Sequence, residues 1–298
     1  MIGLNSLRAA FSFGEGYERT PPGLYVDAET PRGYYIDFRE KITAPGAHAP
    51  EQLLPADLAQ LALGWWERHL SGDAAAGERF MDIARLLEGS GVDEDGELVW
   101  PYPVAVPKLG LSPPWCSALA QSQAASVFVR AFLHSREELF ATAARRAIAP
   151  LLPGSRSGLV ATTAEGPVPE EMPSKTPSLI LNGWIYSLWG AWDVARGLAD
   201  AASDEFFNAS AECLRRSIDE YDVGWWSLYC RYPYRLPDLA KPFYHRLHID
   251  LLEVMYRLVG FPELQATARR WRAYDTPVRR AAVIGEKALL QGLIATGR

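Results

Sequence analysis

Apolar residues recur at helical spacing along most of the chain after residue 53, and the helical segments come in close pairs. In "LSPPW", "KTPSL" and "DTPVRR" a Ser or Thr precedes proline, a pattern typical of an N-cap followed by proline in the first helical turn. The pattern predicts helices at about residues 53–71, 72–87, 113–134, 136–149, 177–199, 203–221, 242–259, 262–273 and 277–296.

The leading helix of each pair begins roughly 60 to 65 residues after that of the previous pair, a spacing typical of stacked helical hairpins. We therefore expect an all-α fold of about four hairpins over residues 53–298, with residues 1–52 as an N-terminal extension that packs on it. The segment "SLILNGWIYSLWGAWDV" is apolar nearly all round, as expected of an inner helix buried on both sides.

The connections between pairs are long and rich in Gly, Pro and aromatic residues: "GELVWPYPVAVPKLGLSPP", "GSRSGLVATTAEGPVPEEMPSKTP" and "YDVGWWSLYCRYPYRLPDLAKP". Short β-hairpins are expected in them. Because each connection leads from an outer helix to the next inner one, all three should emerge on one rim of a ring of hairpins. We expect the functional site on that rim, since long loops on a rigid scaffold are where function concentrates.

Composition and net charge limit the classes of partner and the cellular location that we expect. The chain has 298 residues, a net charge of -6 and a pI near 5.5, which excludes a global basic footprint for nucleic acid. No run reaches the roughly 18 apolar residues that cross a bilayer, and the N-terminus does not read as a signal peptide, so we expect a cytoplasmic protein. Three widely spaced cysteines predict reduced thiols, not disulfides or a zinc site: Cys116, Cys213 and Cys230.

Proton-handling groups concentrate in "YCRYPYRLPDLAKPFYHRLHIDLL", residues 229–252. His245 and His248 lie three apart on one helix face, but zinc pairs on helices usually lie four apart, and no carboxylate or cysteine cluster completes a ligand set. We therefore expect no metal at these histidines. Two alternatives stay open for them: they pack at the start of a helix, or they belong to a functional site. Lysines on all three long connections, together with the Tyr, Arg and His, favour a cleft for a polyhydroxylated anion.

Four blocks occur in an order that points to a family: "WCSALAQSQAASVFVRAFL", "EEMPSKTPSLILNGWIYSLWGAWDV", "YDVGWWSLYCR" and "YHRLHIDLL". Together, over about residues 98–274, they resemble the C-terminal catalytic domain of the heparosan and heparan sulfate D-glucuronyl C5-epimerases. The resemblance implies an incomplete (α/α) toroid with short β-hairpins in its rim loops. It further implies inversion of C5 of glucuronic acid units in a uronate-containing polysaccharide without a cofactor, and a homodimer.

The resemblance also assigns roles to residues of this chain. Glu171, Tyr244 and Tyr229 correspond to the catalytic glutamate and two catalytic tyrosines. Substrate-binding roles fall on Arg231, Asn182, His245, His248, Gln121 and Gln123, to which its place on the first long connection adds Lys108. The sequence departs from the family at three positions, with Met172 and Cys116 in place of tyrosines and Ser122 in place of a glycine.

Inversion at C5 needs one group that removes the proton and another that returns a proton from the opposite face, with the carboxylate neutralised meanwhile. A tyrosine with an unperturbed pKa of about 10 donates without any shift, so we assign Glu171 as the base toward glucuronate and Tyr244 as the acid. Two other functions stay open. A polysaccharide lyase shares the proton abstraction, and Met172 is compatible with a non-catalytic glycan-binding homologue.

Overall fold

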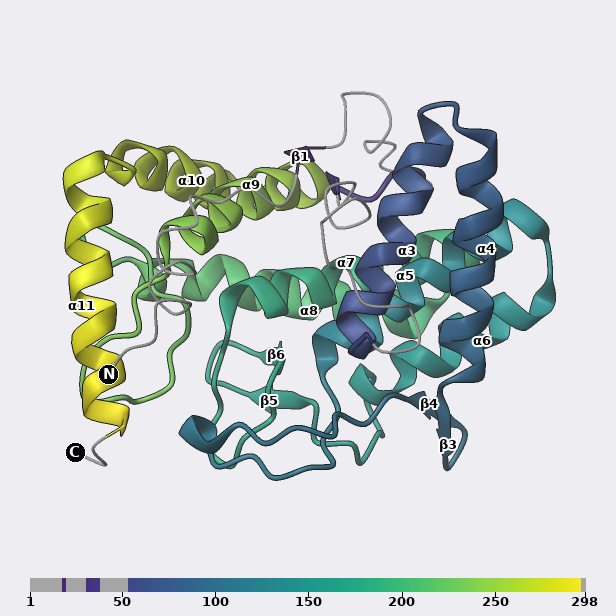
Figure 1. The fold of residues 1–298 in the computed structure, drawn as a ribbon, viewed down its shortest axis with the longest axis horizontal. Helices are drawn as coiled ribbons and strands as arrows, with labels where there is room; N and C mark the ends of the chain where they lie inside the picture. The colour runs from purple at the N-terminus through teal and green to yellow at the C-terminus, as the bar shows by residue number, and fades with distance from the viewer. Residues whose placement is uncertain (1–17, 20–30, 38–52, 296–298) are drawn as a thin grey trace.

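The computed structural model describes residues 18–19, 31–37 and 53–295 of the chain. In these residues, nine α-helices carry the fold, and three small antiparallel sheets of two strands each accompany them (Figure 1). The helices are α3 (Pro55–Leu70), α4 (Ala74–Gly89), α5 (Ala118–Ser135), α6 (Glu138–Ile148), α7 (Leu181–Leu198), α8 (Ala201–Ser217), α9 (Pro242–Val259), α10 (Pro262–Tyr274) and α11 (Pro277–Ala295). The predicted all-α class is confirmed.

The helices pack as four hairpins with an inner and an outer member. Each of α4, α6, α8 and α10 packs on the helix that precedes it, and among the inner helices α5 lies between α3 and α7, while α7 also contacts α9 (Figure 1). As predicted for an inner helix, α7 is buried over nearly its whole length. It ends at Leu198, and the next residue, Ala199, has a left-handed φ of 51°. Asp200 then caps α8 by accepting a hydrogen bond from the Ser203 amide at 2.8 Å.

Two helices start later than the proline pattern predicted, at Ala118 instead of residue 113 and at Leu181 instead of residue 177. Before α5, the Trp115 carbonyl accepts a hydrogen bond from the Tyr102 amide at 2.7 Å, so this segment pairs with the preceding loop. Before α7, the backbone amides of Ser178 and Leu179 donate hydrogen bonds to the buried Glu170 carboxylate and not to helix carbonyls. Of the three Ser/Thr-Pro motifs, only "DTPVRR" begins a helix at its proline, α11 at Pro277. The proline starts predicted for α9 at Pro242 and α10 at Pro262 are confirmed as well.

The long connections carry the expected hairpins in two cases of three. β3 (Val92–Glu94) pairs with β4 (Glu97–Val99), and β5 (Val160–Thr162) pairs with β6 (Pro167–Pro169). In the third connection the described residues form isolated bridges instead, between Asp222 and Ser227 and between Leu228 and Leu239. The remaining pair, β1 (Glu18–Arg19) with β2 (Ile36–Asp37), lies in the N-terminal extension.

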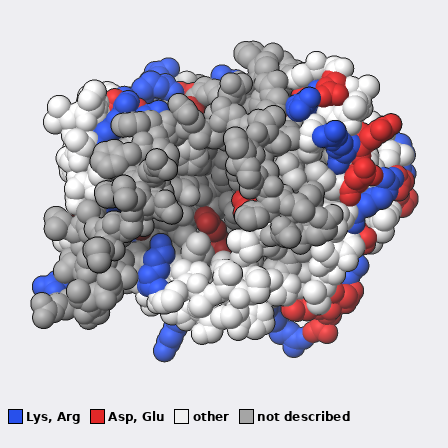
Figure 2. All heavy atoms as spheres, viewed as in Figure 1, with Lys and Arg blue, Asp and Glu red and all other residues white. Residues whose placement is uncertain are grey.

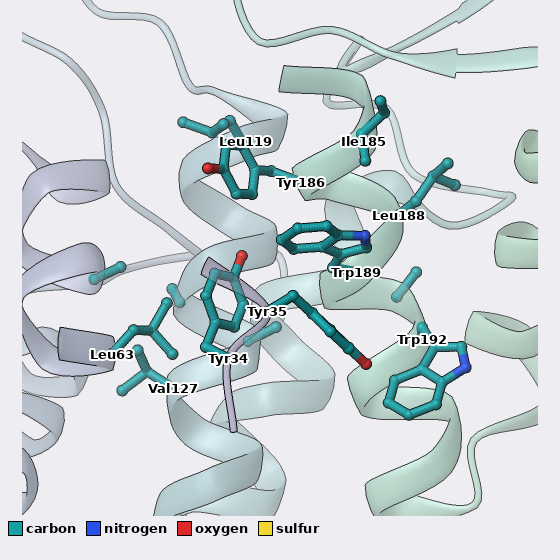
Figure 3. Close-up of a cluster of buried hydrophobic side chains, with 14 of the residues drawn as sticks. Tyr34, Tyr35, Leu63, Leu119, Val127, Ile185, Tyr186, Leu188, Trp189 and Trp192 are labelled. Atoms are coloured by element: carbon teal, nitrogen blue, oxygen red, sulfur yellow. The ribbon is translucent and has the colours of Figure 1, made fainter. Parts of the chain in front are cut away.

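Part of that extension lies inside the core. Tyr34 and Tyr35 are buried among residues of α3, α5 and α7 (Figure 3). Tyr34 stacks on Tyr186 with ring centroids 6.4 Å apart, and Tyr35 lies 4.7 Å from the ring of Trp189. Residues 1–17, 20–30 and 38–52 lie outside the described residues, so the predicted domain division stays a prediction.

A buried ion pair fixes this segment. The Arg130 guanidinium on α5 lies 2.5 Å from the Asp193 carboxylate on α7, and both side chains are fully buried. Arg130 also donates to the Gly33 carbonyl at 2.8 Å, so one guanidinium joins α5, α7 and residues 31–37.

The surface carries charges of both signs, and the cysteines are unpaired. Figure 2 shows Lys and Arg interspersed with Asp and Glu on the side where α4 and α6 lie, where Arg85 pairs with Glu137 at 3.0 Å. All three cysteines are free. No helix in the described part of the chain is long and apolar enough to cross a membrane.

Candidate active site

A pocket of about 390 Å³ opens where the N-terminal ends of the four inner helices meet two of the long connections. The first turns of α3, α5, α7 and α9 each contribute to it, and so do the connections before α5 and before α7. Its described lining residues are Ala56, Asp57, Gln60, Tyr102, Trp115, Ser117, Leu119, Glu171, Met172, Asn182, Tyr186, Phe243, Tyr244 and Leu247. Glu171 and Tyr244, predicted from different segments, therefore line one pocket.

The two adjacent glutamates have separate roles. The buried Glu170 carboxylate accepts hydrogen bonds from the Ser178 amide at 2.7 Å, the Ser178 hydroxyl at 2.8 Å and the Leu179 amide at 2.9 Å. These amides belong to the segment that the sequence predicted as helical, and their bonds to Glu170 explain the later start of α7. Glu170 is thus a structural anchor that leaves its neighbour Glu171 to face the pocket.

Glu171 is held against the start of α7. Its Oε2 accepts a hydrogen bond from Asn182 Nδ2 at 3.4 Å, and a Cβ added at Gly183 would lie only 2.4 Å from the same oxygen. Gly183 therefore provides the space that Glu171 occupies. Burial raises the pKa of Glu171 to about 7, a shift that the positive charge of Lys108 opposes. A carboxyl group with this pKa can exchange protons near neutral pH.

Asn182 offers a further polar atom to the pocket. Its side chain is 6% exposed, and its Oδ1 has no hydrogen-bond partner among the described residues. A buried acceptor without a partner is costly, so a ligand hydroxyl that donates to Asn182 Oδ1 would be favoured.

Two tyrosines stand beside Glu171. The rings of Tyr229 and Tyr244 lie 4.9 Å apart, and Tyr244 is half-buried at the start of α9. Burial, and then the negative charges of Glu171 and Asp57, raise the pKa of Tyr244 to about 12. Burial and the charge of Glu171 also raise the pKa of Tyr229 well above its usual range. Both phenols therefore keep their protons at neutral pH and are suited to donate them.

The predicted arginine lies elsewhere. Arg231 forms an ion pair with Glu220, and its guanidinium lies 5.8 Å from the centre of the Tyr221 ring. It does not line the pocket. The structure thus places a carboxylate partner on the residue that the resemblance assigns to the substrate.

The two histidines are buried away from the pocket. His245 Nε2 donates to the Trp271 carbonyl at 2.9 Å, Nδ1 accepts from the Ser227 hydroxyl at 2.7 Å, and the ring stacks on Trp226. Burial lowers the pKa of His245 to about 4 and that of His248 to about 3. Both are neutral at physiological pH. The prediction that they neutralise a substrate carboxylate finds no support in their position, which matches the packing alternative.

The predicted glutamines and lysine lie around the pocket, not in its lining. Gln121 is buried and donates to the Leu98 and Ala147 carbonyls at 2.8 and 2.9 Å, so it joins β4 to the end of α6. Gln123 accepts from the lining residue Gln60 at 3.3 Å. Lys108 is exposed, but its charge acts on Glu171.

Sequence reasoning missed several lining residues. Asp57 and Gln60 lie three apart at the start of α3, and Tyr102 stacks on Trp115 with ring centroids 4.5 Å apart. The aromatic content of the first long connection was a signal for the latter pair. For Asp57 the only signal was its place in the first turn of an inner helix. In the described part of the chain, no group of three or more His, Cys, Asp or Glu is placed to hold a metal ion.

Known proteins resemble the part of the chain that carries this pocket. A family model described as "D-glucuronyl C5-epimerase C-terminus" matches residues 94–273, more than half of the chain. The chain belongs to the D-glucuronyl C5-epimerase family. A relative named D-glucuronyl C5-epimerase from Caenorhabditis elegans is 31% identical over an alignment of 195 positions, which covers 59% of this chain and 32% of the relative. The chain thus matches about a third of the length of that relative.

Family membership confirms the resemblance drawn from the four blocks. The segment matched to the epimerase family contains Glu171, Tyr229 and Tyr244 together with α5 to α10. Helices α3 and α11 lie outside it, although α3 supplies Asp57 and Gln60 to the pocket.

Proposed function

We propose that this protein inverts C5 of D-glucuronic acid units to L-iduronic acid in a heparosan-like polysaccharide. The observation that carries the proposal is the pairing in one pocket of a carboxyl group with a pKa of about 7 and a phenol with a pKa of about 12. One group is poised to accept a proton near neutrality and the other to donate one, as two-sided epimerisation requires.

In the proposed reaction, Glu171 removes the C5 proton of a glucuronate unit, and the electrons of the C5–H bond move toward the carboxylate as an enolate-like intermediate. Tyr244 then gives its phenolic proton to C5 from the opposite face, which inverts the centre. After product release the Tyr244 phenolate takes a proton from water, because its phenol has a pKa of about 12, and Glu171, with a pKa of about 7, releases the abstracted proton to water. Both groups then return to their starting states. Tyr229 does not line the pocket, but its ring lies 4.9 Å from the Tyr244 ring, and we propose it as the second phenol of the site.

The remaining lining residues suit a sugar chain. The stacked Tyr102 and Trp115 present aromatic surface for the apolar face of a pyranose ring. Asn182 Oδ1 offers a hydrogen bond for a hydroxyl group. We also propose that the four hairpins form the incomplete (α/α) toroid, which the succession of inner contacts from α3 through α5 and α7 to α9 supports.

The test is incubation of the protein with heparosan in deuterated water, followed by NMR of the polymer. The proposal predicts deuterium at C5 together with iduronate signals. Unsaturated uronate absorbing in the ultraviolet, formed without iduronate, would instead identify a lyase. If the polymer binds but neither product forms, the protein is a non-catalytic homologue, an outcome that Met172 in the pocket lining would help to explain.

A further inference from the structure

Leu179 has a backbone conformation that its side chain disfavours. Its φ is 49°, in the left-handed region, where the Cβ of a non-glycine residue lies too close to the following carbonyl oxygen. Leu179 is buried, and it lies three residues before Asn182, which contacts Glu171 in the pocket. Residues strained in this way persist only where surrounding groups hold them, and they cluster at functional sites. The groups that hold Leu179 therefore bear on the candidate active site.

Two buried side chains hold the peptide groups of Leu179. The Glu170 carboxylate accepts a hydrogen bond from the Leu179 amide at 2.9 Å, and the Tyr221 hydroxyl donates one to the Leu179 carbonyl at 2.8 Å. Tyr221 ends a short 3₁₀ helix (Ile218–Tyr221) after α8 and is fully buried. Burial raises the pKa of its phenol well above the usual range, so the hydroxyl keeps the proton that it donates.

The turn before α7 joins the second long connection to the third. Its Ser178 carbonyl accepts a hydrogen bond from the Arg231 amide at 3.0 Å. The Leu181 amide donates to the Tyr229 carbonyl at 3.2 Å. Both of these bonds lie between backbone atoms. In the part of the chain that the structure describes, the Tyr221 hydroxyl is the one side-chain group of the third connection that forms a hydrogen bond with this turn.

The same turn determines what surrounds the Glu171 carboxylate. Helix α7 begins at Leu181, directly after the turn, and its first residues include Asn182 and Gly183. Asn182 Nδ2 donates to Glu171 Oε2 at 3.4 Å, and Gly183 leaves the space that the carboxylate fills. A rotation of the backbone at Leu179 would move the first turn of α7, and both of these contacts would change with it.

We propose that Tyr221 is a positioning residue for the reaction, because its hydroxyl holds Leu179 in the left-handed conformation and thereby holds the start of α7 against the Glu171 carboxylate. This role rests on the proposed function. Tyr221 does not line the pocket, so it acts on the reacting carbon only through Leu179 and Glu171. Glycine adopts a left-handed φ without support, so Leu179→Gly should make the Tyr221 hydroxyl dispensable for positioning.

The test combines Tyr221→Phe, which removes the hydroxyl and keeps the ring, with Leu179→Gly, separately and together. Tyr256→Phe is the matched control, because Tyr256 is half-buried toward the C-terminal end of α9 and does not line the pocket. The measurements are kcat and KM for C5 exchange, the melting temperature, and the pKa of Glu171 from NMR of its carboxyl carbon. Glu171→Gln assigns that carbon signal.

Tyr221→Phe should reduce kcat about 10-fold and change KM less than about 2-fold, because a displaced catalytic group slows the chemical step more than it weakens binding. Water should reach the displaced carboxylate, and the pKa of Glu171 should fall from about 7 toward its ordinary value of 4.5. Burial is the largest cause of the raised pKa, so its loss outweighs the loss of the Asn182 hydrogen bond, which lowers it. Lys108 and Glu170, whose charges also act on Glu171, are the same in all these proteins.

In the Leu179→Gly background, addition of Tyr221→Phe should change kcat less than about 2-fold and leave the pKa of Glu171 near 7. A hydroxyl with only a structural role would cause the same loss in both backgrounds. Equal losses there overturn the positioning role. So does a Tyr221→Phe protein whose kcat and Glu171 pKa match those of Tyr256→Phe, even where the wild type forms iduronate.

The NMR measurement separates this inference from the proposed function. A fall of the Glu171 pKa in Tyr221→Phe that Leu179→Gly prevents supports the positioning of Glu171, even where no protein exchanges C5 protons and the proposed function fails. A Glu171 pKa that Tyr221→Phe leaves unchanged overturns it, whether or not the wild type is active.

Discussion

Gly183 shows how much the site depends on one missing side chain. A Cβ at this position would lie 2.4 Å from Glu171 Oε2 and 2.5 Å from Glu171 Cβ. Alanine favours helix more than glycine does, by about 1 kcal/mol, so Gly183→Ala should leave α7 folded. It should displace the Glu171 carboxylate and reduce the C5 exchange rate about 100-fold, the effect of a misplacement of about 1 Å.

The matched control for this substitution is Gly89→Ala. Gly89 is also helical, at the end of α4, and an added Cβ there would meet nothing within 4 Å. Exchange rate and melting temperature are the two measurements. Full activity in Gly183→Ala would show that the Glu171 position in the structure is not the one used in the reaction.

The pKa values of the two central groups predict the pH profile of the forward reaction. Glu171 must be ionised to act as a base, and its pKa is about 7, so kcat/KM should rise about tenfold per pH unit below that value and level off above it. Tyr244 must keep its proton, and its pKa of about 12 predicts no loss below about pH 9. Initial rates of C5 exchange between pH 5 and pH 9 provide the measurement, and a flat profile would contradict the assignment of Glu171.

At this scale, the sequence predicted the residues whose roles depend on local motifs. Glu171, Asn182 and Tyr244 each start or precede an inner helix, and the structure places all three in the pocket lining. The sequence could not predict which side chains form ion pairs or hydrogen bonds with residues of distant segments. Glu220 engages Arg231, and the Trp271 carbonyl engages His245 from 26 residues away, so both side chains turn from the pocket.

Helix α9 carries two buried neutral histidines that make folding sensitive to acid. Their pKa values in the folded chain are about 4 and about 3, below the usual value of 6.5, so the unfolded chain binds more protons at pH 5. Stability should therefore be present above about pH 6.5 and fall as pH drops below it, by about 2 kcal/mol per histidine between pH 7 and pH 5.

His248→Leu isolates this effect, because His248 has no hydrogen-bond partner among the described residues. The substitution should reduce the loss of unfolding free energy between pH 7 and pH 5 by about 2 kcal/mol. Urea denaturation at both pH values measures it. An unchanged pH dependence in His248→Leu would mean that this imidazole is protonated or hydrated in the folded protein.

The buried ion pair of Arg130 and Asp193 joins the segment 31–37 to α5 and α7. Arg130→Met would leave Asp193 buried without its partner and should cost about 3–5 kcal/mol in the free energy of unfolding. Arg130→Met combined with Asp193→Leu removes both charges and should recover much of that loss. Denaturant titration of the two variants measures their free energies of unfolding. Equal losses of stability in both would show that the unpaired buried charge is not the cause of the loss.

The helix pairs were predictable because their apolar spacing is regular. The starts of α5 and α7 were predicted several residues too early, which shows what apolar spacing and proline motifs cannot determine. In the segment before α7, Ser178 and Leu179 give their amides to Glu170, which competes with the helix for the same hydrogen bonds. A local motif such as Thr-Pro cannot show that competition, because the competing Glu170 carboxylate is positioned by the end of strand β6, outside the motif.

At the scale of the whole molecule, the fold brings the starts of four inner helices to one pocket. Sequence periodicity predicted that all three long connections would meet there, but among the described residues only the first and second line the pocket. Glu171 comes from the second connection, and Tyr244 reaches the pocket from the first turn of α9. The periodicity could not predict that α3, from the start of the helical region, would contribute to the same site. Asp57 on α3 places negative charge at the pocket, where it helps to raise the pKa of Tyr244.

The central claim is that Glu171 and Tyr244 act on opposite faces of one carbon. It is tested most directly by C5 exchange of glucuronate units in deuterated water, comparing Tyr244→Phe with Glu171→Gln. Tyr244→Phe keeps the base and should incorporate deuterium into glucuronate without forming iduronate, because the protonated Glu171 exchanges with the deuterated solvent and returns deuterium to the face from which it removed the proton. Glu171→Gln should show no exchange of glucuronate. Exchange at the wild-type rate in Glu171→Gln, or iduronate formation by Tyr244→Phe, would contradict the account.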